Sequence, residues 1–148
     1  MHLLFVVIGS TLTAIIYHLC LFDCICSLFP MKELSDVDDL TEEKVDNVVK
    51  GFLEDMKEDL IETKGWPINY SASIVSKAAL NAYTRFLTKK YPNIAINAVC
   101  PGFVKTDLNY NTGVLTVEEG AKGPVMLALM PDGGPSGLFF DRTEISTY

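Results

Sequence analysis

The sequence is poor in positive charge. It has 12 Lys and Arg residues against 19 Asp and Glu, a net charge of −7, and the acidic residues concentrate between Glu33 and Glu62. An acidic surface repels nucleic acid and no basic stripe offsets it, so the sequence excludes nucleic acid as a partner. We interpret the acidic stretch as the solvated face of a helix.

The sequence also lacks the ligand spacing of a metal site. Cys24 and Cys26 have no second pair after them, and the two histidines, His2 and His18, both lie upstream. A zinc site needs four ligands at recognisable spacing, so we predict no metal. The default for cysteines in such a chain is a reduced, buried thiol. We expect this of all four: Cys20, Cys24, Cys26 and Cys100.

Charged residues are absent from residues 3–22. This is about the length of a helix that crosses a hydrocarbon core, so a membrane anchor is one interpretation. No basic residue precedes the run, which is not typical of a signal peptide. A buried strand followed by a turn, or a translated stretch unrelated to the rest, are the other two interpretations. We therefore separate an apolar segment, residues 1–30, from a domain over residues 31–148.

After residue 30 the sequence alternates helical and strand patterns. Apolar residues recur at three- and four-residue spacing from Val45 to Leu60, which predicts a helix that ends near Gly65. The further predicted elements are a helix over residues 73–90, a strand over 94–99, a helix from a capping box at Thr116 to residue 129, and a strand over 137–140. Such alternation is typical of a parallel α/β sheet.

Two stretches carry a family resemblance. Residues 70–83 read YSASIVSKAALNAY and residues 97–106 read NAVCPGFVKT. With the Gly-Trp-Pro turn at residues 65–67 and the tail over residues 134–141, they resemble the short-chain dehydrogenase/reductase family. The likeness is closest to its plant carbonyl-reductase branch, of the neomenthol dehydrogenase and salutaridine reductase type, and covers residues 34–148. It implies the carboxy-terminal portion of a doubly wound, Rossmann-like parallel sheet.

In that family a tyrosine stands four residues before a lysine on a helix. The tyrosine exchanges a proton with the substrate oxygen, while the lysine holds the nicotinamide ribose and lowers the pKa of the tyrosine. The resemblance assigns this catalytic and cofactor-binding role to Lys77. Ser73 stands at the tyrosine position. Either the tyrosine has been replaced, or three residues have been inserted and Tyr70 is the catalytic candidate.

The segment over residues 101–106 resembles the Pro-Gly loop that follows the sixth strand of the family. The resemblance implies that four of its residues bind the cofactor: Pro101, Gly102, Val104 and Thr106. Glycine permits close approach of the backbone to a ligand, and proline stiffens the loop. An ordinary strand-to-helix turn is the alternative for this segment.

The resemblance implies an NADPH-dependent carbonyl reductase or alcohol dehydrogenase that acts on a small carbonyl or alcohol substrate. Its location is cytoplasmic by family, or membrane-anchored if residues 3–22 span a bilayer. The glycine-rich turn that holds the pyrophosphate is missing before Leu34, and so is the catalytic serine that follows the fifth strand. We therefore expect a truncated chain, inactive alone. The alternative is a non-catalytic, membrane-anchored interaction protein that reuses the scaffold.

Overall fold

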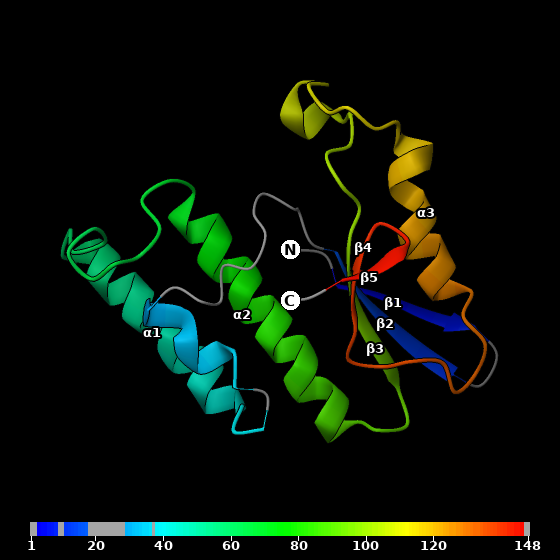
Figure 1. Cartoon of the computed structure of the whole chain (residues 1–148), viewed down its shortest axis with the longest axis horizontal. Coiled ribbons are helices and arrows are strands. Elements are labelled where there is room, and N and C mark those ends of the chain that lie inside the picture. The colour runs from blue at the N-terminus through cyan, green and yellow to red at the C-terminus, as the bar shows by residue number, and fades with distance from the viewer. Residues whose placement is uncertain (1–2, 9–10, 18–28, 37, 147–148) are drawn as a thin grey trace. The chain divides into compact units, whose positions relative to one another are not determined.

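The computed structural model describes residues 3–8, 11–17, 29–36 and 38–146, with side chains from Met31 onward (Figure 1). The chain divides into two compact units. The sheet unit comprises Met1–Cys20 and Leu87–Thr147, and the helical unit comprises Leu21–Phe86. The predicted division at residue 30 stays a prediction.

The sheet unit contains five strands in the order β1-β2-β3-β4-β5. Their bounds are Leu3–Ile8, Thr11–Tyr17, Ala95–Cys100, Phe139–Asp141 and Glu144–Ser146. The pairings of β2 with β3 and of β3 with β4 are parallel, whereas the hairpins β1–β2 and β4–β5 are antiparallel. The α/β class is confirmed, in a sheet that is parallel only at its centre. The sequence pattern did not predict the hairpin at either edge.

The apolar segment at the start of the chain forms strands. Residues 3–8 and 11–17 are β1 and β2, and β2 lies beside β3 in parallel register. This agrees with the strand interpretation of the segment, while the expected turn at residues 9–10 lies outside the described residues. Among the residues that the structure describes, no helix is long and apolar enough to cross a membrane. Residues 9–10 and 18–22 of the predicted anchor lie outside the described part.

A buried polar side chain joins the two ends of the sheet unit. Asn97 in β3 donates from Nδ2 to the Pro135 carbonyl at 2.8 Å, and its Oδ1 accepts from the Leu138 N–H at 3.0 Å. These bonds satisfy the side-chain amide and hold the chain in place just before β4. Val99 and Phe140 then pack with Leu127 in one apolar cluster.

Helix α3, Val117–Ala128, supplies Leu127 and packs against β2 and β3 (Figure 1). Its predicted capping box is confirmed. The Thr116 hydroxyl accepts from the Glu119 N–H at 3.2 Å, and the Glu119 carboxylate accepts from the Thr116 N–H at 2.8 Å. The helix continues through Pro124.

One prediction about cysteine is wrong. Cys100, fully buried at the end of β3, is disulfide-bonded rather than a reduced thiol. Whether a buried sulfur lies within reach of another cysteine depends on the three-dimensional fold, and residue spacing alone does not reveal it. Cys20, Cys24 and Cys26 lie outside the described residues.

The helical unit contains a 3-10 turn, η2 (Phe29–Leu34), and two helices, α1 (Glu42–Lys57) and α2 (Ser71–Lys90). The last turn of α2 belongs to the sheet unit. In the first turn of α1, the Lys44 ammonium donates a hydrogen bond to the carboxylate of Asp39, which precedes the helix, and this lowers the pKa of that carboxyl. The buried face of α1 carries Val45, Val48 and Phe52.

Helix α1 ends earlier than the apolar pattern predicts. It stops at Lys57, because Asp59 adopts the left-handed conformation with φ 58° and the Leu60 N–H bonds to the Asp55 carbonyl at 2.8 Å. Leu53 and Met56, expected on the buried stripe, are 42% and 45% exposed. The chain then turns through Gly65, at φ 77°.

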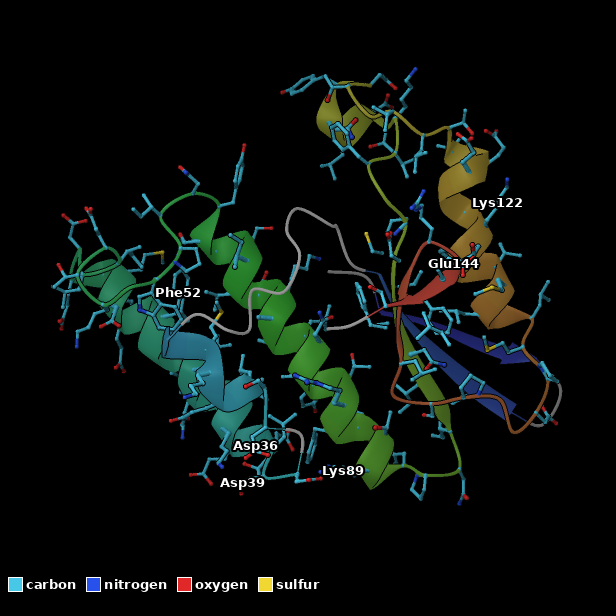
Figure 2. The ribbon with its side chains drawn as sticks, viewed as in Figure 1. Asp36, Asp39, Phe52, Lys89, Lys122 and Glu144 are labelled. Carbon is cyan, nitrogen blue, oxygen red and sulfur yellow. The ribbon has the colours of Figure 1, made fainter. Side chains whose placement is uncertain are left out.

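An aromatic contact links α1 to the turn after it. Phe52, labelled on α1 in Figure 2, meets Trp66 edge to face with ring centroids 5.3 Å apart. The Trp66 indole donates to the Asp55 carboxylate at 2.8 Å. Phe52 and Trp66 are both buried and join the cluster that also contains Val75 and Ala79 of α2. The pair therefore fixes the segment that leads into α2.

Replacing Phe52 with alanine removes this contact and leaves a cavity, so we expect Phe52→Ala to lower the free energy of unfolding by about 3 kcal/mol. The neighbouring Leu53→Ala is the control, because that side chain is 42% exposed and its loss costs about 0.5 kcal/mol. Urea unfolding of the two variants checks this. Equal losses would contradict the assignment of Phe52 to the core.

Candidate functional site

Tyr70 lies just before helix α2 rather than within it. Its φ is 56°, in the left-handed region, and its carbonyl accepts the first hydrogen bond of the helix, from the Ile74 N–H at 2.9 Å. The side chain is 66% exposed. Tyr70 therefore stands outside the helix that carries Lys77, with most of its side chain exposed to solvent.

Ser73 and Lys77 stand one turn apart on α2. Four residues of an α-helix rise about 6 Å, so the two side chains share a face. Both are half-buried, and the helix around Lys77 is anchored by buried Ile74 and Ala78. The helix is regular from Ser71 onward, so the spacing from Ser73 to Lys77 corresponds to about one helical turn.

The same face of α2 continues with buried polar residues. Asn81 follows Lys77 by four residues and is 7% exposed, and its Oδ1 has no hydrogen-bond partner among the described residues. Arg85 follows by four more and donates from Nη2 to the Leu34 carbonyl at 2.5 Å. Ser73, Lys77, Asn81 and Arg85 thus form one polar row along the helix.

The loop over residues 101–106 leaves β3 and returns alongside Leu115. Gly102 has φ 81°, a conformation that favours glycine. Val104 and Leu115 form a parallel bridge, in which the Leu115 N–H donates to the Phe103 carbonyl at 3.1 Å and the Lys105 N–H donates to the Leu115 carbonyl at 2.8 Å. Val104 and Thr106 are half-buried within this loop.

Two glycines let the chain pack tightly against Val104. A Cβ on Gly113 would lie 2.2 Å from the Val104 carbonyl carbon, and one on Gly120 would lie 2.3 Å from Val104 Cγ2. Neither distance is compatible with a side chain. The loop and the first turn of α3 therefore hold Val104 from two directions.

The predicted site residues fall in both units. Lys77 and Tyr70 belong to the helical unit, and Pro101, Gly102, Val104 and Thr106 belong to the sheet unit. Within the sheet unit the structure brings the four loop residues together. Among the described residues, no three His, Cys, Asp or Glu side chains gather as metal ligands.

The sequence analysis did not select Asn109. Its side chain hydrogen-bonds to the backbone at both ends of the segment from Val104 to Thr106. Its Nδ2 donates to the Val104 carbonyl at 2.7 Å, and its Oδ1 accepts from the Thr106 N–H at 3.1 Å. The signal was the Thr-x-x-Asn spacing of residues 106–109, which is that of a capping box with asparagine in place of glutamate.

The chain is closely similar to known proteins. Short-chain dehydrogenase/reductase 1 of Saponaria officinalis is 60% identical over 115 residues, which are 78% of this chain and 38% of that relative. The solved structure of salutaridine reductase from Papaver somniferum is 54% identical with a TM-score of 0.73, over 76% of this chain and 38% of that one. Carbonyl reductase (NADPH) 3 of Rattus norvegicus is 43% identical over 107 residues, 68% of this chain and 38% of that relative.

These matches show the family. The chain belongs to the short-chain dehydrogenase/reductase family, in the plant branch that contains salutaridine reductase. It spans about 38% of the length of the curated relatives that it matches. No family model matches the chain.

The close approach of Gly113 gives a direct test of the loop. We expect Gly113→Ala to break the bridge between Val104 and Leu115, because its Cβ would overlap backbone atoms, and to lower the free energy of unfolding by about 2 kcal/mol. Gly51→Ala is the control, since nothing lies within 4 Å of a Cβ there and alanine favours a helix. Thermal melts of both variants make the measurement. A Gly113→Ala melt that matches the parent contradicts the packing described.

Proposed function

We propose that this chain contributes to the NADPH-dependent reduction of a small ketone or aldehyde, with Lys77 and the loop over residues 101–106 as its cofactor-binding parts. The observation that carries the proposal is the loop. In this loop the half-buried residue Val104 has an N–H without an acceptor among the described residues, and Gly102, two residues earlier, has φ 81°. The similarity to proteins named as reductases supports the reaction type.

The residues present fit a nicotinamide cofactor. An unpaired N–H in a half-buried loop is a donor for a carboxamide oxygen, and leaving it unpaired costs free energy that a ligand recovers. Lys77 offers an ammonium on a four-carbon stem, suited to the hydroxyls of a ribose. NADPH, when bound, supplies the hydride. Of the chain's own residues, Lys77 in the helical unit and Val104 and Thr106 in the sheet unit each offer a group that would hold part of the cofactor.

The proton that such a reduction needs has no evident donor at the family position. Ser73 occupies it, and an unactivated serine hydroxyl is a far weaker acid than a phenol, whose pKa is about 10. The regular helix from Ser71 through Lys77 favours replacement of the tyrosine over an insertion. We infer that the chain binds cofactor better than it turns over substrate, and that with serine at position 73 it is inactive alone.

Lys77 can be tested apart from turnover. We expect Lys77→Gln to weaken NADPH binding about tenfold, the loss of one hydrogen bond to a charged group. Lys89, exposed in the last turn of the same helix (Figure 2), provides the control Lys89→Gln. NADPH fluorescence or calorimetry with the purified chain measures both. No binding by the parent chain, or equal binding by the two variants, would count against the assignment.

Ser73 can be tested by restoring a phenol. We expect Ser73→Tyr to raise the rate of NADPH oxidation with a panel of small ketones and aldehydes, since a placed general acid contributes about 10²- to 10⁴-fold. Tyr70→Phe should leave the parent rate unchanged. The opposite pair of results, no gain from Ser73→Tyr and a loss from Tyr70→Phe, would make Tyr70 the catalytic residue and indicate an inserted sequence.

The serine at position 73 also supports a second function, a non-catalytic binding protein that keeps the scaffold. In that case the chain binds its partner or NADPH without turnover. Cofactor binding that persists while Ser73→Tyr remains without activity would favour this function over the first.

A further inference from the structure

The segment after β3 is closed by its own hydrogen bonds. The Val114 N–H and the Leu115 N–H both donate to the Phe103 carbonyl, at 2.8 and 3.1 Å, and the Asn111 N–H donates to the Thr106 carbonyl at 2.9 Å. The short η3 turn, Asp107–Asn109, lies between these contacts. The loop therefore has a defined shape that depends on no ligand.

The parallel bridge determines where the backbone of Val104 points. The bonds to Leu115 come from the two neighbours of Val104, the Phe103 carbonyl and the Lys105 N–H. In an extended strand, the N–H and carbonyl of one residue point to the edge opposite those of its neighbours. Both polar groups of Val104 thus face away from Leu115.

The carbonyl and the N–H of Val104 differ in their hydrogen bonding. The Val104 carbonyl accepts from Asn109 Nδ2 at 2.7 Å, whereas the Val104 N–H has no acceptor among the described residues. The other end of the same amide, Asn109 Oδ1, accepts from the Thr106 N–H at 3.1 Å. The Asn109 side chain therefore connects the backbone of Val104 with that of Thr106. Within this segment the Val104 N–H is the one backbone donor that has no acceptor among the described residues.

We propose that Asn109 is a positioning residue for the cofactor loop. Its amide fixes the peptide groups of Val104 and Thr106 so that the Val104 N–H is presented in advance to a carbonyl-type acceptor on the ligand. The inference rests on the proposed function for the identity of that ligand, NADPH. The ordering of the loop by Asn109 is a property of the chain without ligand.

Gly113 and Gly120 support this role from the other side. Their close approach, 2.2 Å to the Val104 carbonyl carbon and 2.3 Å to Val104 Cγ2 from an added Cβ, leaves Val104 no room to move toward them. Asn109 then blocks rotation of the peptide that follows Val104. Because few conformations remain for the loop, binding loses little entropy in ordering it.

Three variants of the full chain separate the two bonds of Asn109. Asn109→Ala removes both, and Asn109→Asp keeps an acceptor for the Thr106 N–H but has no donor for the Val104 carbonyl. Thr112→Ala is the matched control, because it removes one hydrogen bond of the same loop, from its hydroxyl to the Asn109 carbonyl at 2.7 Å. Amide hydrogen exchange by NMR is measured without ligand, and NADPH affinity is measured by calorimetry.

We expect the Thr106 N–H to exchange about fivefold faster in Asn109→Ala, the effect of one net hydrogen bond, and to return toward the parent rate in Asn109→Asp. NADPH affinity should fall about fivefold in both Asn109 variants and stay unchanged in Thr112→Ala. The amides of β3 should keep their rates in every variant, which separates a local effect from unfolding.

Two results overturn the proposal independently. An unchanged Thr106 exchange rate in Asn109→Ala shows that the asparagine does not order the loop. Equal NADPH affinity in the parent and both Asn109 variants shows that the ordered loop does not act on the cofactor. A parent chain without NADPH affinity rejects the proposed cofactor and, with it, the positioning of a cofactor. In that case the exchange rates still decide whether Asn109 orders the loop.

Discussion

The return of the chain at Val104 and Leu115 is the constraint on which the sheet unit depends. The bridge directs the segment after β3 back toward α3, and it forms only because Gly113 and Gly120 have no side chains where Val104 lies. Gly123 extends the same principle one turn later, since a Cβ there would lie 2.1 Å from the Arg142 carbonyl oxygen, in the turn between β4 and β5. Three glycines thus place α3 against both the loop and the last hairpin. Close backbone packing at these glycines adds to the apolar contact of Leu127 with Val99 and Phe140.

The helical unit depends on a different constraint, the regularity of α2. From Ser71 to Lys90 the helix has no break, so the spacing between Ser73 and Lys77 translates directly into one turn on one face. Because Tyr70 adopts a left-handed backbone conformation, the helix does not extend to it. Tyr70 is therefore not part of the helical face that carries Ser73 and Lys77. The proposed function therefore assigns to separate residues two tasks that the family resemblance assigns to one Tyr-Lys pair. Lys77 is proposed to bind the cofactor, while a serine stands at residue 73.

Local sequence signals predicted the elements that local chemistry determines. The Thr116 capping box, the β-branched run of β3 and the long apolar face of α2 all appear where their residues indicate, within two residues at each end. Helix α1 ends earlier than its apolar pattern predicts. The reason is that Asp59 adopts a left-handed conformation, which sequence reasoning assigns to glycine or asparagine. The uncharged start of the chain was compatible with both a membrane helix and a buried strand. An unbroken apolar run lacks the alternation of apolar and polar residues that distinguishes a helix from a strand. The Cys100 disulfide depends on the three-dimensional fold, so the sequence pattern alone could not reveal it, whereas the Thr-x-x-Asn spacing of residues 106–109 was a local signal for the bond between Asn109 and Thr106.

The candidate site shows the same division. Motif spacing singled out Lys77 and the residues of the Pro-Gly loop as candidates, and their cofactor-binding role stays a prediction. It was not enough to show why the loop is suited to a ligand. That follows from the geometry of the loop. The parallel bridge pairs the backbone groups of the residues on either side of Val104, and the Asn109 side chain donates to the Val104 carbonyl. The Val104 N–H is left as the donor. The donor exists whether residue 73 is a tyrosine or a serine, since no bond of the loop involves that position. We therefore propose that binding and proton transfer depend on different residues in this chain, so that loss of the tyrosine leaves the donor of the loop in place.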